Sequence, residues 1–208
     1  SSFLKRDEVI LDVTYLLVTQ AEQYIAFTDA ASSVPGLSDW IEQLIAESTG
    51  KDATGRLPIA TEDTARARVG GSFTVAYAGT GADLTVEGSL GAHFIFWEWV
   101  TALMGAALKI DPFNQPNVTE AKEATSAVLA EWNNSLPVIT TANSEGDVEI
   151  FGDGNTLVAA LKNLIANTDA DGYIAITAYL DRAGDSKLSE LRAILSEKSG
   201  RPVSFGWG

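Results

Sequence analysis

The sequence predicts an α/β fold, a three-layer αβα sandwich built around a five-stranded, mainly parallel sheet. Short runs rich in β-branched and aromatic residues alternate along the chain with longer stretches of helical periodicity, which is the pattern of parallel βαβ units. The chain has 208 residues, of which 46% are hydrophobic, and this is enough for one domain with a sizeable core. We find no internal repeat and no low-complexity segment, so a repeat architecture is not expected.

Five short runs bounded by turn residues are predicted to form strands. These runs are residues 24–28, 57–60, 73–78, 173–180 and 202–205. Five longer stretches carry apolar residues at helical spacing and are predicted to form helices. These stretches are residues 36–49, 87–109, 118–133, 156–167 and 186–199.

Two segments leave their secondary structure open. Residues 3–20 have the length of a helix, but Val9, Ile10 and Val13 are β-branched, which lowers helix propensity. Residues 145–151 are long enough for one short extra strand. We therefore place a helical lead-in at residues 1–23 and the folded domain at residues 24–208. Because the chain begins with Ser-Ser rather than methionine, we expect a fragment of a longer protein.

The apolar run over residues 94–108 is predicted to be a buried core helix. It is shorter than the ~18 residues of a membrane-spanning helix, and Glu98 interrupts it. A charge between Trp97 and Trp99 needs a partner, because an unpaired buried ion costs several kcal/mol. We therefore expect a buried Glu98 to have a partner or to be protonated.

The charge balance excludes some classes of partner. Fourteen basic residues against 28 acidic ones give a net charge of −14 and a pI of about 4.3. This argues against binding to nucleic acid and to anionic membranes. An anionic ligand is accommodated only if cations gather at one cleft, for which Lys51, Lys122, Arg66 and Arg68 are the candidates.

Cysteine and histidine usage narrows the chemistry further. The chain has no cysteine and one histidine, His93, so a metal site would have to be made of carboxylates, and no ligand cluster is recognisable. The absence of cysteine fits a reducing compartment such as the cytoplasm. No phosphate-binding motif follows a predicted strand; Gly79-Thr-Gly81 is a weak anion-loop candidate and is more often a plain turn.

The segment from Asp111 to Lys122 carries the strongest functional signal. It reads Asp-Pro-Phe-Asn-Gln115-Pro-Asn117-Val-Thr-Glu-Ala-Lys122, with Asn117 as the expected N-cap of a new helix. On a helical wheel a buried stripe is expected at Val118, Ala121, Thr125, Val128, Leu129 and Trp132. Lys122 falls at the edge of this stripe, where a lysine either reaches out to solvent or points into a cleft.

This segment and two others resemble the glucose-6-phosphate isomerase family. The run Leu90-Gly-Ala-His-Phe-Ile-Phe-Trp-Glu98 precedes it at the family's spacing, and Glu47-Ser-Thr-Gly-Lys51 is similar to the family's Glu-Ser-Asn-Gly-Lys motif. The final segment, ending Phe205-Gly-Trp-Gly, is similar to a divergent branch that can be fused to a transaldolase. The resemblance spans roughly residues 24–208. It implies one sugar isomerase (SIS) domain of an enzyme that has two, acting on a sugar phosphate without a cofactor. Family members are typically homodimers.

The resemblance implies a role for each matched residue. It makes Glu47 the catalytic base, which moves a proton between C1 and C2 of the sugar through an enediol. Lys122 and Gln115 supply an ammonium and an amide donor near the substrate, where oxyanion charge develops. Lys51 adds a positive charge near Glu47 and the substrate; a solvated surface lysine is the equal alternative. Glu98 supports the Gln115 loop from behind.

The residues themselves support part of this assignment. On the helical wheel Glu47 lies beside Trp40, which predicts a partly desolvated carboxylate suited to a general base, and Gly50 is placed to end its helix. His93 does not match the family's catalytic histidine and is predicted to pack in the core. The family's Tyr-Glu-His-Lys is here Trp97-Glu98-Trp-Val, so ring opening has no assigned residue.

Three readings follow, in order of preference. The first is the C-terminal SIS domain of a glucose-6-phosphate isomerase, which we expect to be inactive without the second SIS domain. The second is a non-catalytic SIS module that binds a phosphosugar as a sensor. The third is a structural half-domain that serves dimerisation.

Overall fold

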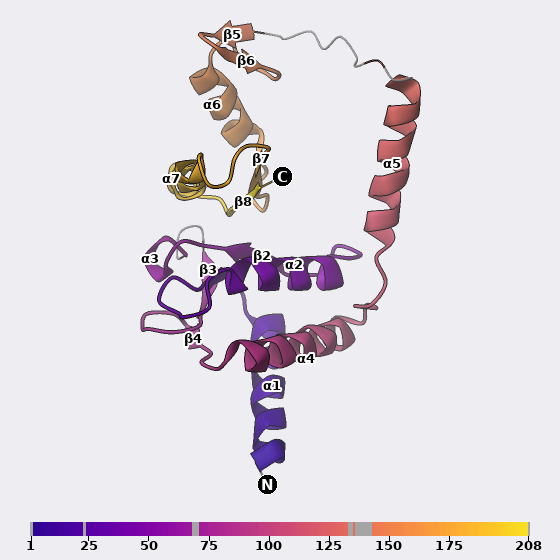
Figure 1. The fold of residues 1–208 in the computed structure, drawn as a ribbon, viewed down its shortest axis with the longest axis vertical. Coiled ribbons are helices and arrows are strands. Elements are labelled where there is room, and N and C mark those ends of the chain that lie inside the picture. The colour runs from indigo at the N-terminus through magenta and orange to yellow at the C-terminus, as the bar shows by residue number, and fades with distance from the viewer. Residues whose placement is uncertain (1, 23, 68–70, 133–134, 136–142, 208) are drawn as a thin grey trace. The chain divides into compact units, whose positions relative to one another are not determined.

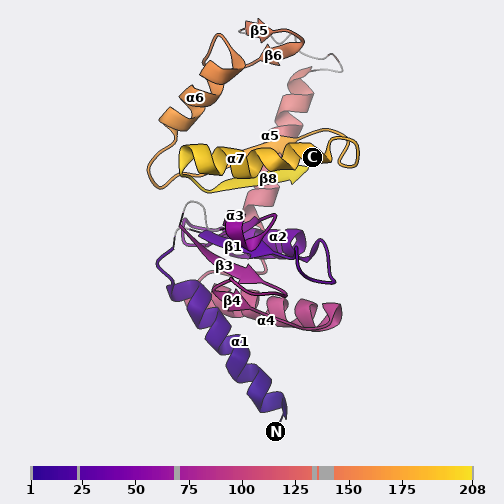
Figure 2. The same ribbon diagram turned by 90° about the vertical axis from the view of Figure 1, so that its left-hand side faces the viewer.

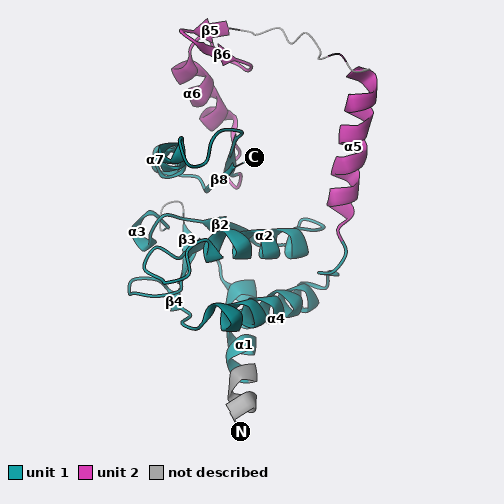
Figure 3. Ribbon diagram, in the orientation of Figure 1, with its two compact units in different colours: residues 1–114, 173–208 teal, residues 115–172 magenta. Residues whose placement is uncertain are grey.

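The computed structural model describes residues 2–22, 24–67, 71–132, 135 and 143–207. The chain divides into two compact units, which Figure 3 distinguishes by colour. Unit 1 consists of Ser1–Asn114 together with Tyr173–Gly208, and unit 2 consists of Gln115–Gly172. Each unit is described by itself.

The centre of unit 1 is a parallel four-stranded sheet (Figure 1). Its strands are β1 (Tyr24–Thr28), β2 (Leu57–Ala60), β3 (Ser72–Ala76) and the short β4 (Leu84–Thr85), in the order β2-β1-β3-β4. All five residues of β1 and of β3 are buried. Strands with continuous apolar runs are those covered on both faces, as expected for a parallel α/β sheet.

Three helices pack together against one face of this sheet. They are α1 (Ser2–Thr19), α2 (Leu37–Thr49) and α4 (Leu90–Leu108). Phe27 of β1 meets Trp97 of α4 edge to face, with 5.5 Å between ring centroids, and Trp97 is fully buried. The core of this layer also takes Val13, Leu17, Ile25, Leu37, Ile41, Ile45, Phe73, Val75, Tyr77, Val100 and Met104.

A second, smaller core lies on the other face of the sheet. It joins Tyr24, Ala26 and Ile59 to Ala67 of the short helix α3 (Thr64–Ala67). The C-terminal part of unit 1 adds a parallel pair, β7 (Ile174–Ala178) and β8 (Val203–Trp207), connected through the 3₁₀ helix η1 (Ser186–Ser189) and α7 (Glu190–Ser199). β8 contacts β2, and in Figures 1 and 2 α7 and α4 lie on opposite sides of the sheet.

A buried ion pair fixes the C-terminal part of unit 1 to the segment after β2. Arg192 of α7 has a side chain that is 2% exposed, and its Nη2 lies 2.6 Å from Oε2 of Glu62. Its Nε donates to both carboxylate oxygens of Glu62, at 3.0 and 3.1 Å, and Nη1 donates to the carbonyl of Val203 at 3.4 Å. Burying a guanidinium costs several kcal/mol of folding free energy unless partners such as these compensate its charge.

Unit 2 holds the helices α5 (Pro116–Trp132) and α6 (Leu157–Asn167) and an antiparallel hairpin of β5 (Asn143–Glu145) and β6 (Val148–Ile150). α5 has no buried residue among those described, so the stripe expected from Val118 to Trp132 is not buried; Leu129 is 57% exposed. The expected N-cap was also wrong. α5 begins at Pro116, because proline is favoured in the first helical position and lacks the N–H that would go unpaired there, and this puts Asn117 inside the first turn.

The predicted α/β class is confirmed, and the architecture is compatible with a three-layer sandwich. Of the five expected strands, three join the central sheet with β4, and the other two form the β7–β8 pair, so a single five-stranded sheet stays a prediction. The ambiguous N-terminal segment is helical, and the segment near residue 145 forms a hairpin rather than one strand. In the described part of the chain, no helix combines the length and apolar character needed to cross a bilayer.

Candidate functional site

Lys51 joins the two loops that the sequence motifs single out. Lys51 follows α2 and is only 7% exposed. Its Nζ donates one hydrogen bond to the carbonyl of Asp111, at 2.6 Å, and another to the carbonyl of Asn114. Asn114 is the residue before Gln115 in the chain. The Glu47-Ser-Thr-Gly-Lys51 motif is therefore bound directly to the loop that leads into Gln115. The expected alternative of a solvated lysine was wrong.

The end of α4 shapes the loop that Lys51 binds. Lys109 caps α4 in the left-handed region, with φ of 60°. Pro112 then folds back onto Gly105, where an added Cβ would come within 2.7 Å of the proline ring, so only glycine fits. Asp111 Oδ1 accepts a hydrogen bond from the backbone N–H of Phe113 at 2.9 Å, which closes an Asx turn. These local contacts present the two carbonyls to Lys51.

The loop on the other side of the contact is constrained by its own backbone. A Cβ on Gly50 would lie 2.6 Å from the carbonyl oxygen of Ala46, so glycine is required at the end of α2. Gly50 ends the helix as predicted, with φ of −73°, and its N–H donates to the carbonyl of Ala46. Asp52 and Ala53 have φ of 53° and 55°, which is uncommon for residues other than glycine. The carbonyl of Lys51 accepts bonds from the N–H and the hydroxyl of Thr54, at 3.0 and 2.9 Å.

Glu47 lies in the last turn of α2 and is exposed. Its Oε1 accepts a hydrogen bond from Nε2 of Gln43, one turn earlier, at 3.0 Å. Trp40, expected to desolvate Glu47, packs instead against Phe94, with 4.7 Å between ring centroids. The prediction that Trp40 shields Glu47 from solvent is therefore wrong, because the Trp40 ring packs against Phe94 of α4.

Replacing Lys51 by methionine tests the link between the two loops. The variant loses the two hydrogen bonds to the carbonyls of Asp111 and Asn114, and bonds to charged groups are worth about 1.5–3 kcal/mol each. We expect amide hydrogen exchange of residues 110–114 to accelerate about tenfold or more, while that of β1 is unchanged. The control is Lys187→Met, which removes an exposed lysine from η1. If the amides of residues 110–114 exchanged at the same rate in Lys51→Met and in the parent, the role given to Lys51 would be contradicted.

Gln115 and Lys122 belong to unit 2. Gln115 is exposed at the start of α5, and its carbonyl accepts from the N–H of Thr119 at 3.5 Å. Lys122 is exposed in the second turn of α5, and its carbonyl accepts from the hydroxyl of Ser126 at 2.8 Å. The meeting of Glu47 and Lys122 across one hollow stays a prediction.

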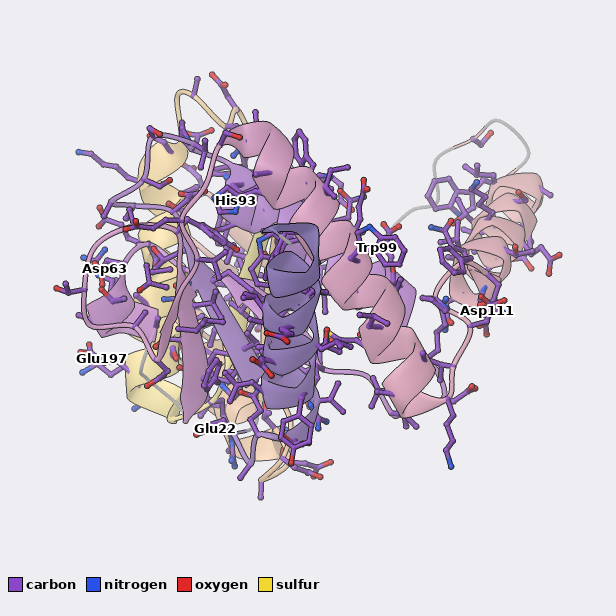
Figure 4. All side chains as sticks on the ribbon, turned by 90° about the horizontal axis from the view of Figure 1, so that it is seen from below. Glu22, Asp63, His93, Trp99, Asp111 and Glu197 are labelled. Atoms are coloured by element: carbon purple, nitrogen blue, oxygen red, sulfur yellow. The ribbon has the colours of Figure 1, made fainter. Side chains whose placement is uncertain are left out.

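Glu98 and the lone histidine occupy opposite sides of α4. Glu98 is exposed, so the premise of a buried ion that needs a partner was wrong; the neighbouring Trp99 is also 58% exposed and lies on the outer side of α4 in Figure 4. His93 is 2% exposed and packs edge to face on Tyr77 at 5.2 Å, which confirms its predicted place in the core. Burial lowers the pKa of His93, which favours the neutral form of its imidazole.

The structure also contains a cleft that the sequence analysis missed. It has a volume of about 320 Å³ and lies where β1 and β2 end, lined among others by Asp29, Ser38 and Thr61. Ser38 is in the first turn of α2, nine residues or ~14 Å along the helix axis from Glu47. The cleft is therefore not the hollow expected beside Glu47. The available signal was an acidic residue within two positions of the end of two predicted strands, Asp29 and Glu62, because ligand sites favour the carboxyl ends of parallel strands.

The pKa of one carboxyl group near this cleft, that of Glu42, is strongly raised. Burial, reinforced by the nearby charge of Asp39, raises the pKa of Glu42 to about 7, while a hydrogen bond from the N–H of Ala60 to its Oε2 at 2.9 Å and the charge of Arg192 oppose the rise. Glu42 is five residues before Glu47 on α2, about 140° around the helix, so the two carboxylates point to different sides.

The shifted carboxylate predicts a pH-dependent stability. Between its usual value of 4.5 and about 7, folded Glu42 keeps a proton that the unfolded chain releases. Stability from this group is therefore present below pH 4.5 and is lost as the pH rises to 7, by roughly 3 kcal/mol. We expect Glu42→Gln to be more stable than the parent at pH 8 but not at pH 4.5, as measured by urea unfolding. Glu98→Gln, an exposed control, should match the parent at both; a constant gap for Glu42→Gln would refute the assignment.

The remaining candidate cations in unit 1 are Arg66 and Arg68. Arg66 of α3 pairs with Asp63, with 3.8 Å between Nε and Oδ2, and Arg68 lies outside the described residues. Gly79 and Gly81 stand in an exposed turn after β3, both with positive φ. Within the described ranges no group of three or more His, Cys, Asp or Glu side chains could hold a metal ion.

Comparison with known proteins gives no relative for this chain. No family model, no curated protein and no solved structure matches it.

Proposed function

We propose that this chain is the C-terminal SIS domain of a glucose-6-phosphate isomerase, interconverting glucose 6-phosphate and fructose 6-phosphate. The observation that supports the proposal is the contact of Lys51 with the carbonyls of Asp111 and Asn114. Two separate sequence blocks resemble that family, and this contact joins them in the fold. A chance resemblance gives no reason for the two blocks to be bound to each other.

In the proposed mechanism, the Glu47 carboxylate takes the proton from C2 of the open-chain aldose. The electron pair forms the C1–C2 double bond, and the aldehyde oxygen takes up the charge as an enediolate. The Lys122 ammonium and the Gln115 amide stabilise that charge. Glu47 then returns the proton to C1, and the proton of the 2-hydroxyl passes to the oxygen on C1, which gives the ketone at C2 and a neutral hydroxyl at C1. Lys51 acts by positioning the loop before Gln115, because its ammonium is engaged there.

The proposal includes partners that complete the site. Glu47 is exposed in this chain, so the proposed enzyme covers it with its N-terminal SIS domain, or with the second subunit of a homodimer. Closure of this kind expels water and strengthens electrostatic interactions with the substrate. These partners also bring the cations for the phosphate that this acidic chain lacks.

The exposure of Glu47 favours one competing function, a phosphosugar sensor. A sensor needs donors around the sugar but no shielded carboxylate beside C1 and C2. Incubating the full-length protein with glucose 6-phosphate in D₂O separates the two functions. An isomerase exchanges the C2 hydrogen for deuterium and forms the ketose, both visible by NMR. Binding of the sugar phosphate with no exchange would exclude the isomerase.

The same preparation tests Lys122. We expect Lys122→Ala in the full-length protein to lower kcat/KM by about 10²-fold, the usual loss when one donor to a developing oxyanion is removed. Steady-state kinetics in both directions provide the measurement. Lys162→Ala, which removes an exposed lysine from α6, is the matched control and should keep the parent value. Parallel losses in both variants would show that net charge, and not the position of Lys122, is responsible.

A further inference from the structure

The cleft at the carboxyl ends of β1 and β2 has the features of a second ligand site. Its volume of about 320 Å³ is within the range of small-molecule sites. Residues of unit 1 from four places in the sequence line it: the end of β1, the start of α2, the end of β2 and the C-terminal segment. The proposed catalytic residue Glu47 is at the other end of α2, so the cleft is separate from the proposed isomerase site.

One wall of the cleft is aromatic. Phe205 and Trp207 are two residues apart on β8, so their side chains project to the same side of the strand. Their ring centroids are 5.0 Å apart in an edge-to-face arrangement, and both rings are half-buried. An aromatic pair of this kind offers a broad apolar surface to a ligand. The C–H face of a sugar ring or of a polyol chain presents a matching surface.

The rest of the cleft lining is polar and rich in hydroxyl groups. Thr61, Ser186 and Ser189 contribute hydroxyls. Those of Thr61 and Ser189 donate to the carbonyls of Phe27 and Ser186, at 3.1 and 2.8 Å, and keep lone pairs that accept from a ligand. Ser38 adds a buried hydroxyl that lies beside the buried hydroxyl of Tyr77, and no hydrogen bond of acceptable geometry is made by either among the described residues.

The charges of the cleft disfavour an anionic ligand. Three carboxylates line it, and its two guanidinium groups are both already paired, Arg192 with Glu62 and Arg182 with Asp39 at 3.3 Å. The first turn of α2, the usual place for an anion, is taken by Asp29, whose Oδ2 accepts from the N–H of Ser38 at 3.0 Å. Phosphate would meet a surplus of negative charge there.

We propose that this cleft binds an uncharged sugar or polyol, stacked on Phe205 and Trp207 and hydrogen-bonded by its hydroxyls to the carboxylates and hydroxyls of the rest of the lining. A carboxylate or a guanidinium group can hydrogen-bond two neighbouring hydroxyls of a ligand at once. The C–H groups of the ligand would pack against the aromatic rings. The ligand differs in charge from the sugar phosphate of the proposed isomerase reaction.

The test titrates the 208-residue chain with D-glucose and with sorbitol, using ligand-observed saturation-transfer NMR. We expect saturable binding that Trp207→Ala weakens about tenfold, the factor expected from loss of one aromatic contact. Trp207→Phe keeps an aromatic surface and should stay within about twofold of the parent. Trp99→Ala removes an equally large exposed indole outside the cleft and should bind as the parent does. Circular dichroism checks that each variant is folded.

Competition experiments separate the sources of binding. Inorganic phosphate in excess should leave glucose binding unchanged, and so should Glu47→Gln, because the proposed isomerase site lies elsewhere. Equal binding by Trp207→Ala and the parent would overturn the proposal. So would displacement of glucose by phosphate, or the absence of saturable binding of both probes to the parent chain. None of these outcomes bears on isomerase activity, which is measured separately.

Discussion

Replacing Glu47 by glutamine in the full-length protein is expected to lower isomerase turnover by about 10²–10⁴-fold, the usual contribution of a positioned general base. Glutamine keeps the size of the side chain and an oxygen that accepts from Gln43, so the fold and the binding of the sugar phosphate should be preserved. What is lost is the ability to take the proton from C2. Coupled-assay kinetics and calorimetric binding of glucose 6-phosphate measure the two effects.

The matched control for this variant is Glu8→Gln. Glu8 is also an exposed helical glutamate, but it lies in α1, outside the segments that resemble the family. It should keep full turnover. Normal turnover in Glu47→Gln would remove the isomerase assignment, and equal losses in both variants would make the effect one of charge.

The largest effect on stability is expected from Glu62→Leu. This change leaves the Arg192 guanidinium, 2% exposed, without its carboxylate in the interior of unit 1. Breaking a buried pair by removal of one partner costs about 3–5 kcal/mol, a large part of the 5–15 kcal/mol typical of a whole domain. Urea unfolding at pH 7 measures the free energy, and we expect β7, β8 and α7 to lose hydrogen-exchange protection first.

A second arginine–carboxylate pair provides the control. Arg182 and Asp39 also connect the C-terminal part of unit 1 to α2, but their side chains are 70% and 59% exposed. Asp39→Ala should cost no more than about 1 kcal/mol. The double variant Glu62→Leu, Arg192→Met replaces both buried charges with apolar groups and should regain most of the lost stability. A double variant as unstable as Glu62→Leu would show that lost packing, not the unpaired charge, is the cause.

Much of unit 1 was predictable because its strands and helices are locally determined. The strands at Tyr24–Thr28 and Leu57–Ala60 match their predicted bounds residue for residue, since continuous apolar runs end at turn residues. The pairing of β7 with β8 was not predictable, because register and partner choice depend on contacts far apart in the sequence. α3 and β4 were missed because four residues and two residues carry no usable period.

The candidate site was predictable as a set of residues but not as an arrangement. The helical wheel placed Glu47 beside Trp40 correctly by angle, but it could not show that Phe94 of α4 takes the indole. The helical wheel also predicted a buried stripe of apolar residues on α5. A wheel cannot show burial, because burial depends on which elements pack against the helix. Lys51 was the residue least understood from the sequence, since its partners are carbonyl groups that every residue possesses.

Lys51 binds main-chain oxygens, and this sets which changes the segment from Asp111 to Asn114 can tolerate in related chains. The ammonium does not distinguish one side chain from another at these two positions, so exchange of Asn114 for another residue preserves its acceptor. Insertion or deletion of a single residue shifts both oxygens out of reach. Loop length, more than side-chain identity, is therefore the heritable feature that this lysine keeps fixed.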